Sequence, residues 1–331
     1  MIYPWHDRTW RELLAQAPPP ALLLYGAADT GKTAFARAYA RFLLCESPLN
    51  QGACGECASC RLFEHHAHPD FYLLAPDGDD GSSTGRKLPQ IKIDAVRELL
   101  EPLNQSSVRG GRRVVLIAPA DSLNVQAANA LLKILEEPPQ AVMFLLVSHR
   151  RERLLPTVRS RCRPLLLPAP NHAQALQFLQ QQHISDAENL LAFHGGAPLF
   201  AHEPEQDSLR ATLLDLLAQP RLLAILDFAA DFDKHKYPFA LLLDWLHKWL
   251  ADLALALHAL PPRYYPAHAQ AVATLAARTH PATLFRFQDH LNRLAPYGHH
   301  SLNVRMQAEA LLSSYLLMLQ NKPFHFQGNP P

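Results

Sequence analysis

Short apolar runs alternate with amphipathic stretches over the first half of the chain. A run typical of a buried strand occupies 21–25, and further runs typical of strands occupy 70–75, 113–118, 142–147 and 164–167. Between them, apolar residues recur at helical spacing over 33–44, 93–101 and 124–137. Strands that alternate with helices in this way predict a parallel sheet with helices on both faces up to about residue 168.

Strand signals disappear after a proline-rich junction near residue 168. A small helical segment is expected over 171–203, and an all-helical region over 208–322. This pattern predicts three domains, at 1–168, 169–207 and 208–331.

Two further stretches qualify this picture. Residues 76–90 are rich in Gly, Ser, Asp and Pro and predict a loop. In the all-helical region, an apolar stripe is formed by Leu241, Trp245, Trp249 and Leu250. We interpret the stripe as ordinary core packing.

Composition narrows the class of protein. The chain has 331 residues, of which 48% are hydrophobic, so a large buried core is possible. A net charge of +1 argues against a protein held mainly by the phosphate backbone of nucleic acid. No apolar run reaches the about 18 residues of a membrane span, and the charged N-terminus lacks the apolar core of a signal peptide. We therefore expect a cytoplasmic protein without membrane contact.

A phosphate-binding loop is predicted directly after the first apolar run. Gly26, Gly31, Lys32 and Thr33 are the fixed positions of GAADTGKT, which fits the spacing G-x-x-x-x-G-K-[ST]. Such a turn aims backbone N–H groups at a phosphate, and the following helix adds its positive dipole end. The nucleotide would be ATP or ADP. Lys32 would reach the β-phosphate and, in ATP, the γ-phosphate, and Thr33 would offer its hydroxyl to Mg²⁺. The alternative is an ordinary glycine-containing turn, which the flanking strand and helix disfavour.

Hydrolysis needs more than this loop, because an acid must hold Mg²⁺ and another group must activate water. In this fold both are expected at the end of a neighbouring strand, and the candidate run ends at Ala118. Ala118 and Pro119 stand where an active motor would carry Asp-Glu. Asp121, further along, is interpreted as a turn or helix-capping residue. The sequence therefore predicts that nucleotide binds but is not turned over.

Four closely spaced cysteines form a second candidate site. They are Cys45, Cys54, Cys57 and Cys60, with the spacing C-x8-C-x2-C-x2-C. In a cytosolic protein this density predicts tetrahedral Zn²⁺, and a closed shell of four thiolates makes the metal structural rather than catalytic. Alternatives are that His65, His66 or His68 replaces one cysteine, or that the thiols are unrelated. The fifth cysteine, Cys162, is interpreted as a packed residue.

Several separated motifs together resemble one protein family. Besides the phosphate loop and the cysteine set, they are HPDF at 68–71, IDAVREL at 93–99, NALLKILEEPP at 129–139 and SRC at 160–162. In this order they resemble the bacterial clamp-loader subunits of DNA polymerase III, which include the gamma/tau motor and its delta-prime paralogue. The specific match covers about residues 20–165.

The resemblance implies an α/β P-loop AAA+ domain with a parallel sheet and a zinc insert at 45–60. A small helical lid and an all-α C-terminal collar domain would follow. Family members form a five-subunit arc with gamma/tau and delta subunits that opens the sliding clamp and places it on primed DNA. Arg161 matches the family's arginine finger, which acts on a neighbouring subunit. The alternative for Arg161 is a surface salt bridge within its own domain.

Two departures from the motor subunits resemble delta-prime. The acidic pair is absent at Ala118-Pro119, and the lid stretch 194–199 lacks the arginine that senses nucleotide in the motors. Many delta-prime chains have a degraded phosphate loop, whereas this loop is intact. We expect a stator, a subunit of the polymerase III holoenzyme without catalysis of its own.

The two alternatives to the stator are an enzyme and a nucleic-acid-binding module. A motor ATPase would need an acidic pair near residue 118, which the sequence lacks. A zinc-based nucleic-acid module would need basic residues around the cysteines. That segment instead contains Glu46 and Glu56, and only Arg61 follows closely.

Overall fold

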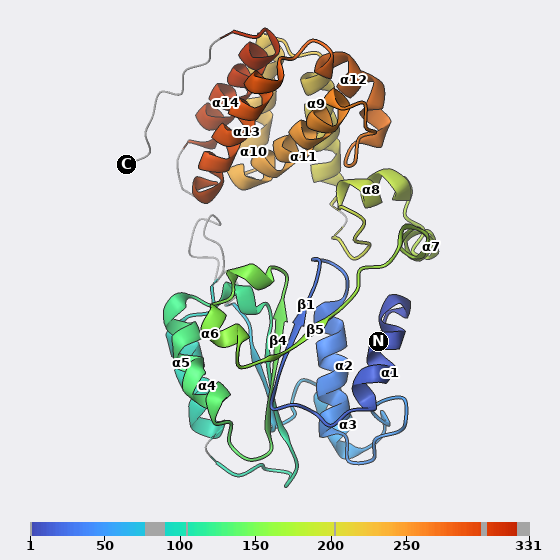
Figure 1. Cartoon of the computed structure of the whole chain (residues 1–331), viewed down its shortest axis with the longest axis vertical. Helices are drawn as coiled ribbons and strands as arrows, with labels where there is room; N and C mark the ends of the chain where they lie inside the picture. Colours follow the sequence, from blue (N-terminus) through green and yellow to red (C-terminus); the bar gives the residue numbers. More distant parts are fainter. Residues whose placement is uncertain (1, 77–89, 104, 202, 299–302, 323–331) are drawn as a thin grey trace. The chain divides into compact units, whose positions relative to one another are not determined.

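The computed structural model describes residues 2–76, 90–103, 105–201, 203–298 and 303–322. Most of the loop predicted at 76–90 lies outside these ranges. The chain divides into two compact units (Figure 1). Among the described residues, the first unit comprises those within 2–76, 90–178 and 197–199, and the second comprises those within 179–196 and 200–322.

A five-stranded parallel sheet forms the centre of the first unit, as predicted. Its strands are β1 (Ala21–Tyr25), β2 (Phe71–Leu74), β3 (Arg113–Ile117), β4 (Val142–Ser148) and β5 (Arg163–Leu166). Their order is β2-β3-β4-β1-β5. In the register, Leu23 of β1 lies opposite Leu146 of β4 and Pro164 of β5. All five strands predicted from apolar runs are thus confirmed, with ends that differ by at most one residue.

Helices cover both faces of the sheet (Figure 1). One face carries α4 (Ile93–Leu103), α5 (Val125–Glu136) and α6 (Pro156–Arg159), and the other carries α1 (Asp7–Leu14) and α2 (Lys32–Leu44). Because strand side chains alternate between faces, Leu23 belongs to the core under α4 and α5, and Leu22 to the core under α2. Short elements complete the unit: η1 (Pro4–His6), α3 (Ala58–Glu64), η2 (Ala120–Ser122) and η3 (Arg151–Arg153).

The rest of the described chain is helical. It contains α7 (His172–Gln181), α8 (Ala187–Phe193), α9 (Pro204–Ala218), α10 (Leu222–Lys234), α11 (Phe239–Leu257), η4 (Pro266–His268), α12 (Ala269–Ala276), α13 (Pro281–Leu294), η5 (Ala295–Tyr297) and α14 (Val304–Leu319). Helix α9 begins at Pro204 rather than at residue 208, because proline suits the first helical position. No helix in the described ranges is both long and apolar enough to cross a bilayer.

The predicted apolar stripe on α11 is core, as interpreted. Trp245, Trp249 and Leu250 are buried, and Leu241 packs against them. Trp249 Nε1 donates to the Tyr315 hydroxyl at 2.8 Å, and that hydroxyl donates to the Leu217 carbonyl oxygen at 3.0 Å. One hydrogen-bonded chain therefore joins α11, α14 and α9 inside the second unit.

Candidate functional site

The residues predicted to bind phosphate lie where β1 ends and α2 begins. Gly26 follows Tyr25 at the end of β1, and Gly31 is the N-cap of α2, which starts at Lys32. The φ angle of Gly31 is 91°, in the left-handed region that favours glycine. Gly26, Gly31, Lys32 and Thr33 thus lie in the strand–turn–helix context that the motif requires.

The N-terminal segment packs on this loop. Trp5 Nε1 donates to the Thr30 carbonyl oxygen at 2.9 Å, and the Tyr3 ring stacks on Trp5 with centroids 4.9 Å apart. A Cβ atom on Gly31 would come within 2.4 Å of the Tyr3 ring. Glycine at position 31 is therefore required both by its φ angle and by the approach of Tyr3.

Lys32 is almost completely buried, with 2% of its surface exposed. Its ammonium group donates a hydrogen bond to the Ala27 carbonyl oxygen in the same loop. Burial lowers the pKa of Lys32 to about 8, while the carboxylates of Asp29 and Asp121 act in the opposite direction. Lys32 is therefore mostly charged at neutral pH. The charged Lys32 and the backbone N–H groups at the start of α2 fit a phosphate, which would replace the Ala27 carbonyl oxygen as the partner of Lys32.

Two imidazoles lie near the same lysine. His6 donates from Nε2 to the Pro168 carbonyl oxygen at 3.2 Å, and His149 follows β4. The Nδ1 atom of each is buried and has no hydrogen-bond partner among the described residues. Burial lowers the pKa of both histidines, and the charge on Lys32 adds to this effect. Sequence reasoning missed both, because they are far from the loop in the sequence and no motif includes them.

The end of β3 carries no acid at the predicted metal position. Ala118 and Pro119 follow the strand, and Asp121 lies in η2. The Asp121 carboxylate accepts a hydrogen bond from the His149 backbone N–H at 3.0 Å. Its position in a turn agrees with the expected turn or capping role, because it joins the segments that follow β3 and β4.

Arg161 lies between α6 and β5 and has partners within its own unit. Its Nε donates to Glu136 Oε1 at 2.8 Å, Nη2 also bonds to this carboxylate, and Nη1 donates to the Thr157 carbonyl oxygen at 2.8 Å. The pair is partly exposed, at 29% for Arg161 and 49% for Glu136. The role of Arg161 toward a neighbouring subunit stays a prediction.

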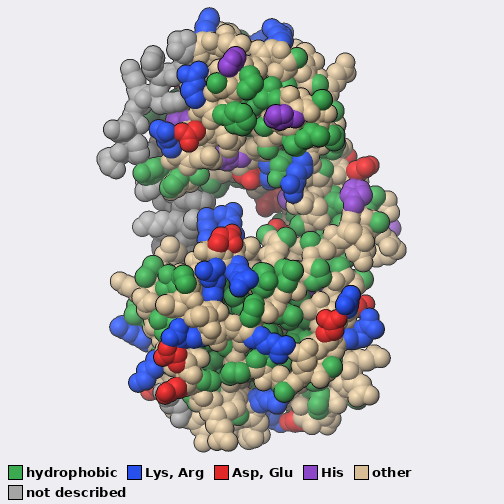
Figure 2. All heavy atoms as spheres, in the orientation of Figure 1, with side chains coloured by type: hydrophobic (Ala, Val, Ile, Leu, Met, Phe, Trp, Pro, Cys, Tyr) green, Lys and Arg blue, Asp and Glu red, His purple; other side chains and the backbone are tan. Residues whose placement is uncertain are grey.

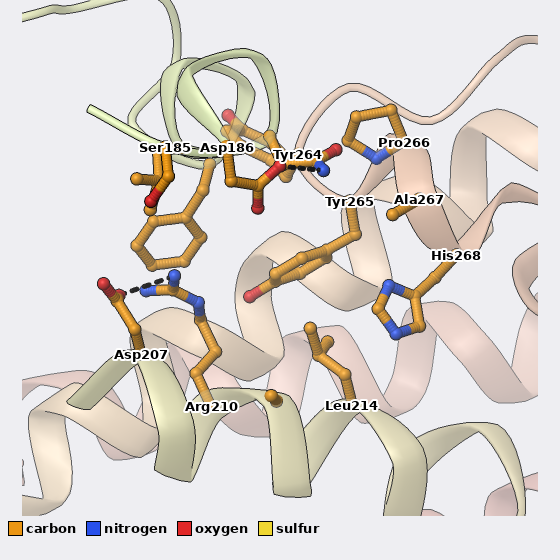
Figure 3. A pocket seen from close by; sticks show the side chains of 14 residues that line it. Ser185, Asp186, Asp207, Arg210, Leu214, Tyr264, Tyr265, Pro266, Ala267 and His268 are labelled. Atoms are coloured by element: carbon orange, nitrogen blue, oxygen red, sulfur yellow. Dashed lines mark hydrogen bonds and ion pairs between the residues drawn. The ribbon is translucent and has the colours of Figure 1, made fainter. Parts of the chain in front are cut away.

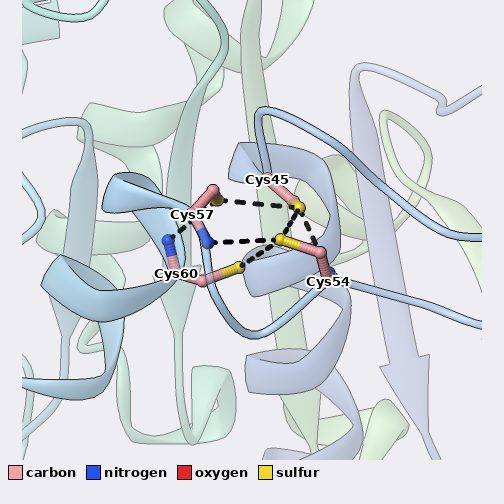
Figure 4. Close-up of side chains that lie close together, drawn as sticks. All are labelled: Cys45, Cys54, Cys57 and Cys60. Atoms are coloured by element: carbon pink, nitrogen blue, oxygen red, sulfur yellow. Dashed lines mark hydrogen bonds between the residues drawn. The ribbon is translucent and has the colours of Figure 1, made fainter.

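The four predicted metal ligands come together (Figure 4). All four sulfurs lie within 4.8 Å of one another. The Sγ–Sγ distance is 3.5 Å from Cys45 to Cys54, 3.9 Å from Cys45 to Cys57, and 4.0 Å from Cys54 to Cys60. A tetrahedral zinc ion with bonds of ~2.3 Å would separate its sulfurs by ~3.8 Å. The cluster therefore fits a zinc-sized ion.

Backbone N–H groups stabilise these sulfurs. The N–H groups of Cys54 and Cys57 donate to Cys45 Sγ at 3.3 Å and to Cys54 Sγ at 3.4 Å. The N–H of Cys60 donates to Cys57 Sγ at 3.4 Å. Although burial acts in the opposite direction, hydrogen bonds from the backbone of Cys60 and Glu46 lower the pKa of Cys57 to about 6. The thiolate that binds metal is thus favoured at this position.

His68 anchors the cysteine segment rather than replacing a cysteine. The Asp70 N–H donates to His68 Nδ1 at 3.1 Å, so Nε2 carries the proton and donates to Ser59 Oγ at 2.7 Å. The Ser59 hydroxyl donates in turn to the Leu44 carbonyl oxygen at 2.5 Å. Both ring nitrogens are therefore used, and the HPDF motif ties α3 and the end of α2 to the start of β2.

Cys162 is buried in the core on the α5 side of the sheet. Burial raises the pKa of its thiol to about 11. A neutral, inaccessible thiol is a poor nucleophile, so its interpretation as a packed residue is confirmed.

On the face shown in Figure 2, the described residues form no continuous basic surface. Lys and Arg side chains are scattered over it, with Asp and Glu among them (Figure 2). This distribution agrees with the nearly neutral composition.

A pocket of about 290 Å³ lies within the second unit, beside α8, α9 and η4 (Figure 3). Its Arg210 pairs with Asp207 at 2.7 Å and lies over the Phe193 ring, 3.7 Å from Cζ to the centroid. The guanidinium is thus compensated within the pocket wall, and none of the predicted site residues lines the pocket.

Comparison with known proteins agrees with the motifs. The model of the family described as "DNA polymerase III, delta subunit" matches residues 8–171. The chain is 38% identical over 256 residues to DNA polymerase III subunit delta' of Pseudomonas aeruginosa, which covers 75% of this chain and 76% of that protein. It is 37% identical over 226 residues to the subunit delta' of Escherichia coli, covering 65% of each.

A more distant relative is the DNA polymerase III subunit tau/gamma of Haemophilus influenzae. It is 34% identical over 193 residues, or 58% of this chain and 26% of that protein. The match to subunit delta' is both longer and more similar. The chain belongs to the DNA polymerase III delta-prime family.

Proposed function

We propose that this chain is the delta-prime stator of a DNA polymerase III clamp loader, which assists the ATP-dependent loading of the sliding clamp onto primed DNA. The observation that carries the proposal is the end of β3, where Ala118 and Pro119 replace the acids of a motor. The nearby carboxylate of Asp121 is engaged by the His149 backbone. A subunit of this kind contributes to ATP hydrolysis by its neighbours and acts in the cytoplasm.

Nucleotide would bind at Gly26, Gly31, Lys32 and Thr33. The geometry of the loop supports this proposal, because Gly31 caps α2 and Lys32 carries its charge near the start of that helix. When bound, Mg-nucleotide would supply the phosphates that replace the Ala27 carbonyl oxygen as the partner of Lys32. Without an acid at positions 118 and 119, the bound nucleotide would be structural.

Zinc would be held by Cys45, Cys54, Cys57 and Cys60. The distances between their sulfurs and the N–H donors around them support this assignment. Zn²⁺ supplies a closed tetrahedral link that a segment this short and polar needs in order to fold. The metal would fix the segment between α2 and α3.

Arg161 would act in trans on ATP bound by a gamma/tau neighbour. A guanidinium stabilises the charge that develops on the transferred phosphate. The small helical lid at 169–207 and the collar at 208–331 would provide contacts to gamma/tau and delta subunits. The clamp and the primed DNA would then be reached through the assembly.

The test of this function is ATP turnover by the isolated chain. Purified protein is expected to hydrolyse ATP no faster than its Lys32→Ala variant, since both lack the acids for Mg²⁺ and water. A clear rate that depends on Lys32 would instead favour a motor ATPase. Co-purification with gamma/tau and delta would test membership of the assembly separately.

A further inference from the structure

A partly buried arginine lies against the cysteine cluster. Arg41 is in the last turn of α2, and its Nη2 lies 3.5 Å from the Gly55 carbonyl oxygen, within the turn between Cys54 and Cys57. The Nε atom is buried and has no standard hydrogen-bond partner among the described residues. An arginine donor that is buried without an acceptor is costly, so its surroundings need explanation.

The surroundings of Arg41 point to the Cys60 sulfur. The Arg41 side chain is a hydrogen-bond donor to the Cys60 thiol. Within the described chain, Arg41 forms one ion pair, with Glu64 at 3.3 Å, and the Glu64 side chain is 65% exposed. Such an exposed pair does not by itself explain the buried side of the guanidinium.

The position of the Arg41 guanidinium beside the cysteines has an electrostatic explanation. Four thiolates around one Zn²⁺ carry a net charge of −2, and a partly buried excess charge is costly unless it is compensated. A guanidinium offers several donors in a fixed plane, and it keeps its charge at any pH of interest. It can therefore bond to a sulfur and to the turn carbonyl at the same time.

We propose that Arg41 is a positioning residue of the metal site, which donates to the Cys60 thiolate and to the Gly55 carbonyl oxygen. It offsets part of the excess negative charge of the metal cluster and holds the turn between Cys54 and Cys57 in its metal-binding shape. This inference rests on the proposed zinc site. It also connects the metal to α2, the helix whose first turn carries Lys32.

The experiment measures zinc affinity of the full chain by competition with a chelator. Arg41→Leu is expected to weaken zinc binding by about 10- to 100-fold, the usual loss when an outer partner of a metal ligand is removed. Arg41→Lys keeps the positive charge but not the planar arrangement of donors. Its zinc affinity should therefore lie between that of Arg41→Leu and that of the natural chain.

Two matched controls separate the proposed contact from general effects. Arg61→Leu removes an exposed arginine next to Cys60 in the sequence, and Glu64→Gln removes the ion pair of Arg41 while keeping the guanidinium. Both should bind zinc within about twofold of the natural chain, because exposed charges contribute little.

A spectroscopic measurement distinguishes loss of the proposed contact from a general loss of stability in Arg41→Leu. In Co²⁺-loaded protein, the sulfur-to-cobalt charge-transfer bands should shift for Arg41→Leu and remain unchanged for Arg61→Leu. Equal affinities and equal spectra for these two variants would overturn the inference, even if zinc binds. If the natural chain holds no zinc at all, the proposed metal site itself fails, which is a distinguishable result.

Discussion

Arg161 and Glu136 form an ion pair that joins the two most specific motifs of the chain. Arg161 belongs to SRC and Glu136 to NALLKILEEPP, and the Nε–Oε1 distance is 2.8 Å. Since both side chains are partly exposed, the pair is expected to contribute only about 0–1 kcal/mol to folding. An ion pair this weak would allow the guanidinium to make the proposed contact with a phosphate on a neighbouring subunit.

The first prediction separates the two roles of Arg161. Arg161→Ala should leave the melting temperature nearly unchanged, yet reduce the ATPase rate of the reconstituted clamp loader strongly. Arginine fingers contribute about 10³–10⁵ in other phosphate-loop enzymes, and the remaining sites of the assembly would dilute this loss. Glu136→Gln is the matched control, because it breaks the same ion pair but keeps the guanidinium. If both variants reduce the rate equally, Arg161 acts only within its own unit.

The second prediction concerns pH and nucleotide binding. The pKa of Lys32 in the folded chain, about 8, lies below its ordinary 10.5. Between these two pKa values the unfolded state binds more protons than the folded state. The free energy of unfolding therefore rises with pH in this range, because a neutral lysine costs less to bury than a charged one. Phosphate needs the charged form, so affinity for Mg-nucleotide should fall above about pH 8, by at most roughly tenfold per pH unit for one proton. Calorimetric titration from pH 7 to 9.5 checks this, with Lys32→Ala as a weak, pH-independent control.

The third prediction concerns the metal. Purified protein should contain one zinc ion per chain, and serine at Cys45, Cys54, Cys57 or Cys60 should abolish it, because a closed site needs all four thiolates. Cys162→Ser is the control that keeps the zinc, since Cys162 lies in the core. Elemental analysis gives the metal content. A strong chelator should lower the melting temperature of the natural chain and of Cys162→Ser, but not that of the four serine variants that lack zinc. Zinc retained by all four variants would contradict the assignment.

The fourth prediction concerns the second unit. Tyr315→Phe removes a buried hydroxyl that accepts from Trp249 and donates to Leu217, leaving two buried groups without partners. The expected cost is about 2–3 kcal/mol in urea unfolding followed by tryptophan fluorescence. Tyr265→Phe removes only one hydrogen bond, to the Trp245 carbonyl oxygen, and should cost about 1 kcal/mol. Equal losses would show that the shared hydroxyl has no special role.

Many elements and both candidate sites of this protein could be predicted from short stretches of its sequence. The central strands β1, β3 and β4 are buried and are continuous apolar runs. The edge strands β2 and β5 are more exposed but also contain short apolar runs, so all five could be predicted from the order of residues along the chain. The phosphate loop and the cysteine set could be predicted because their ligands are close in the sequence and their spacing is fixed by geometry. Asn124 likewise caps α5 by accepting from the Ala127 N–H, and this helix was predicted from local signals.

Contacts between distant segments were decided only by the tertiary structure. Examples are the contacts of Tyr3 and Trp5 with the phosphate loop, of Arg41 with the turn between the cysteines, and of Glu136 with Arg161. These contacts depend on how helices and strands pack, so they cannot be predicted from the spacing of residues within one segment. The sequence by itself determined which elements form and which residues can bind phosphate or metal, because propensity and ligand spacing act over a few residues. The fold decided the protonation and partners of those residues, since burial and nearby charge depend on groups far apart along the chain.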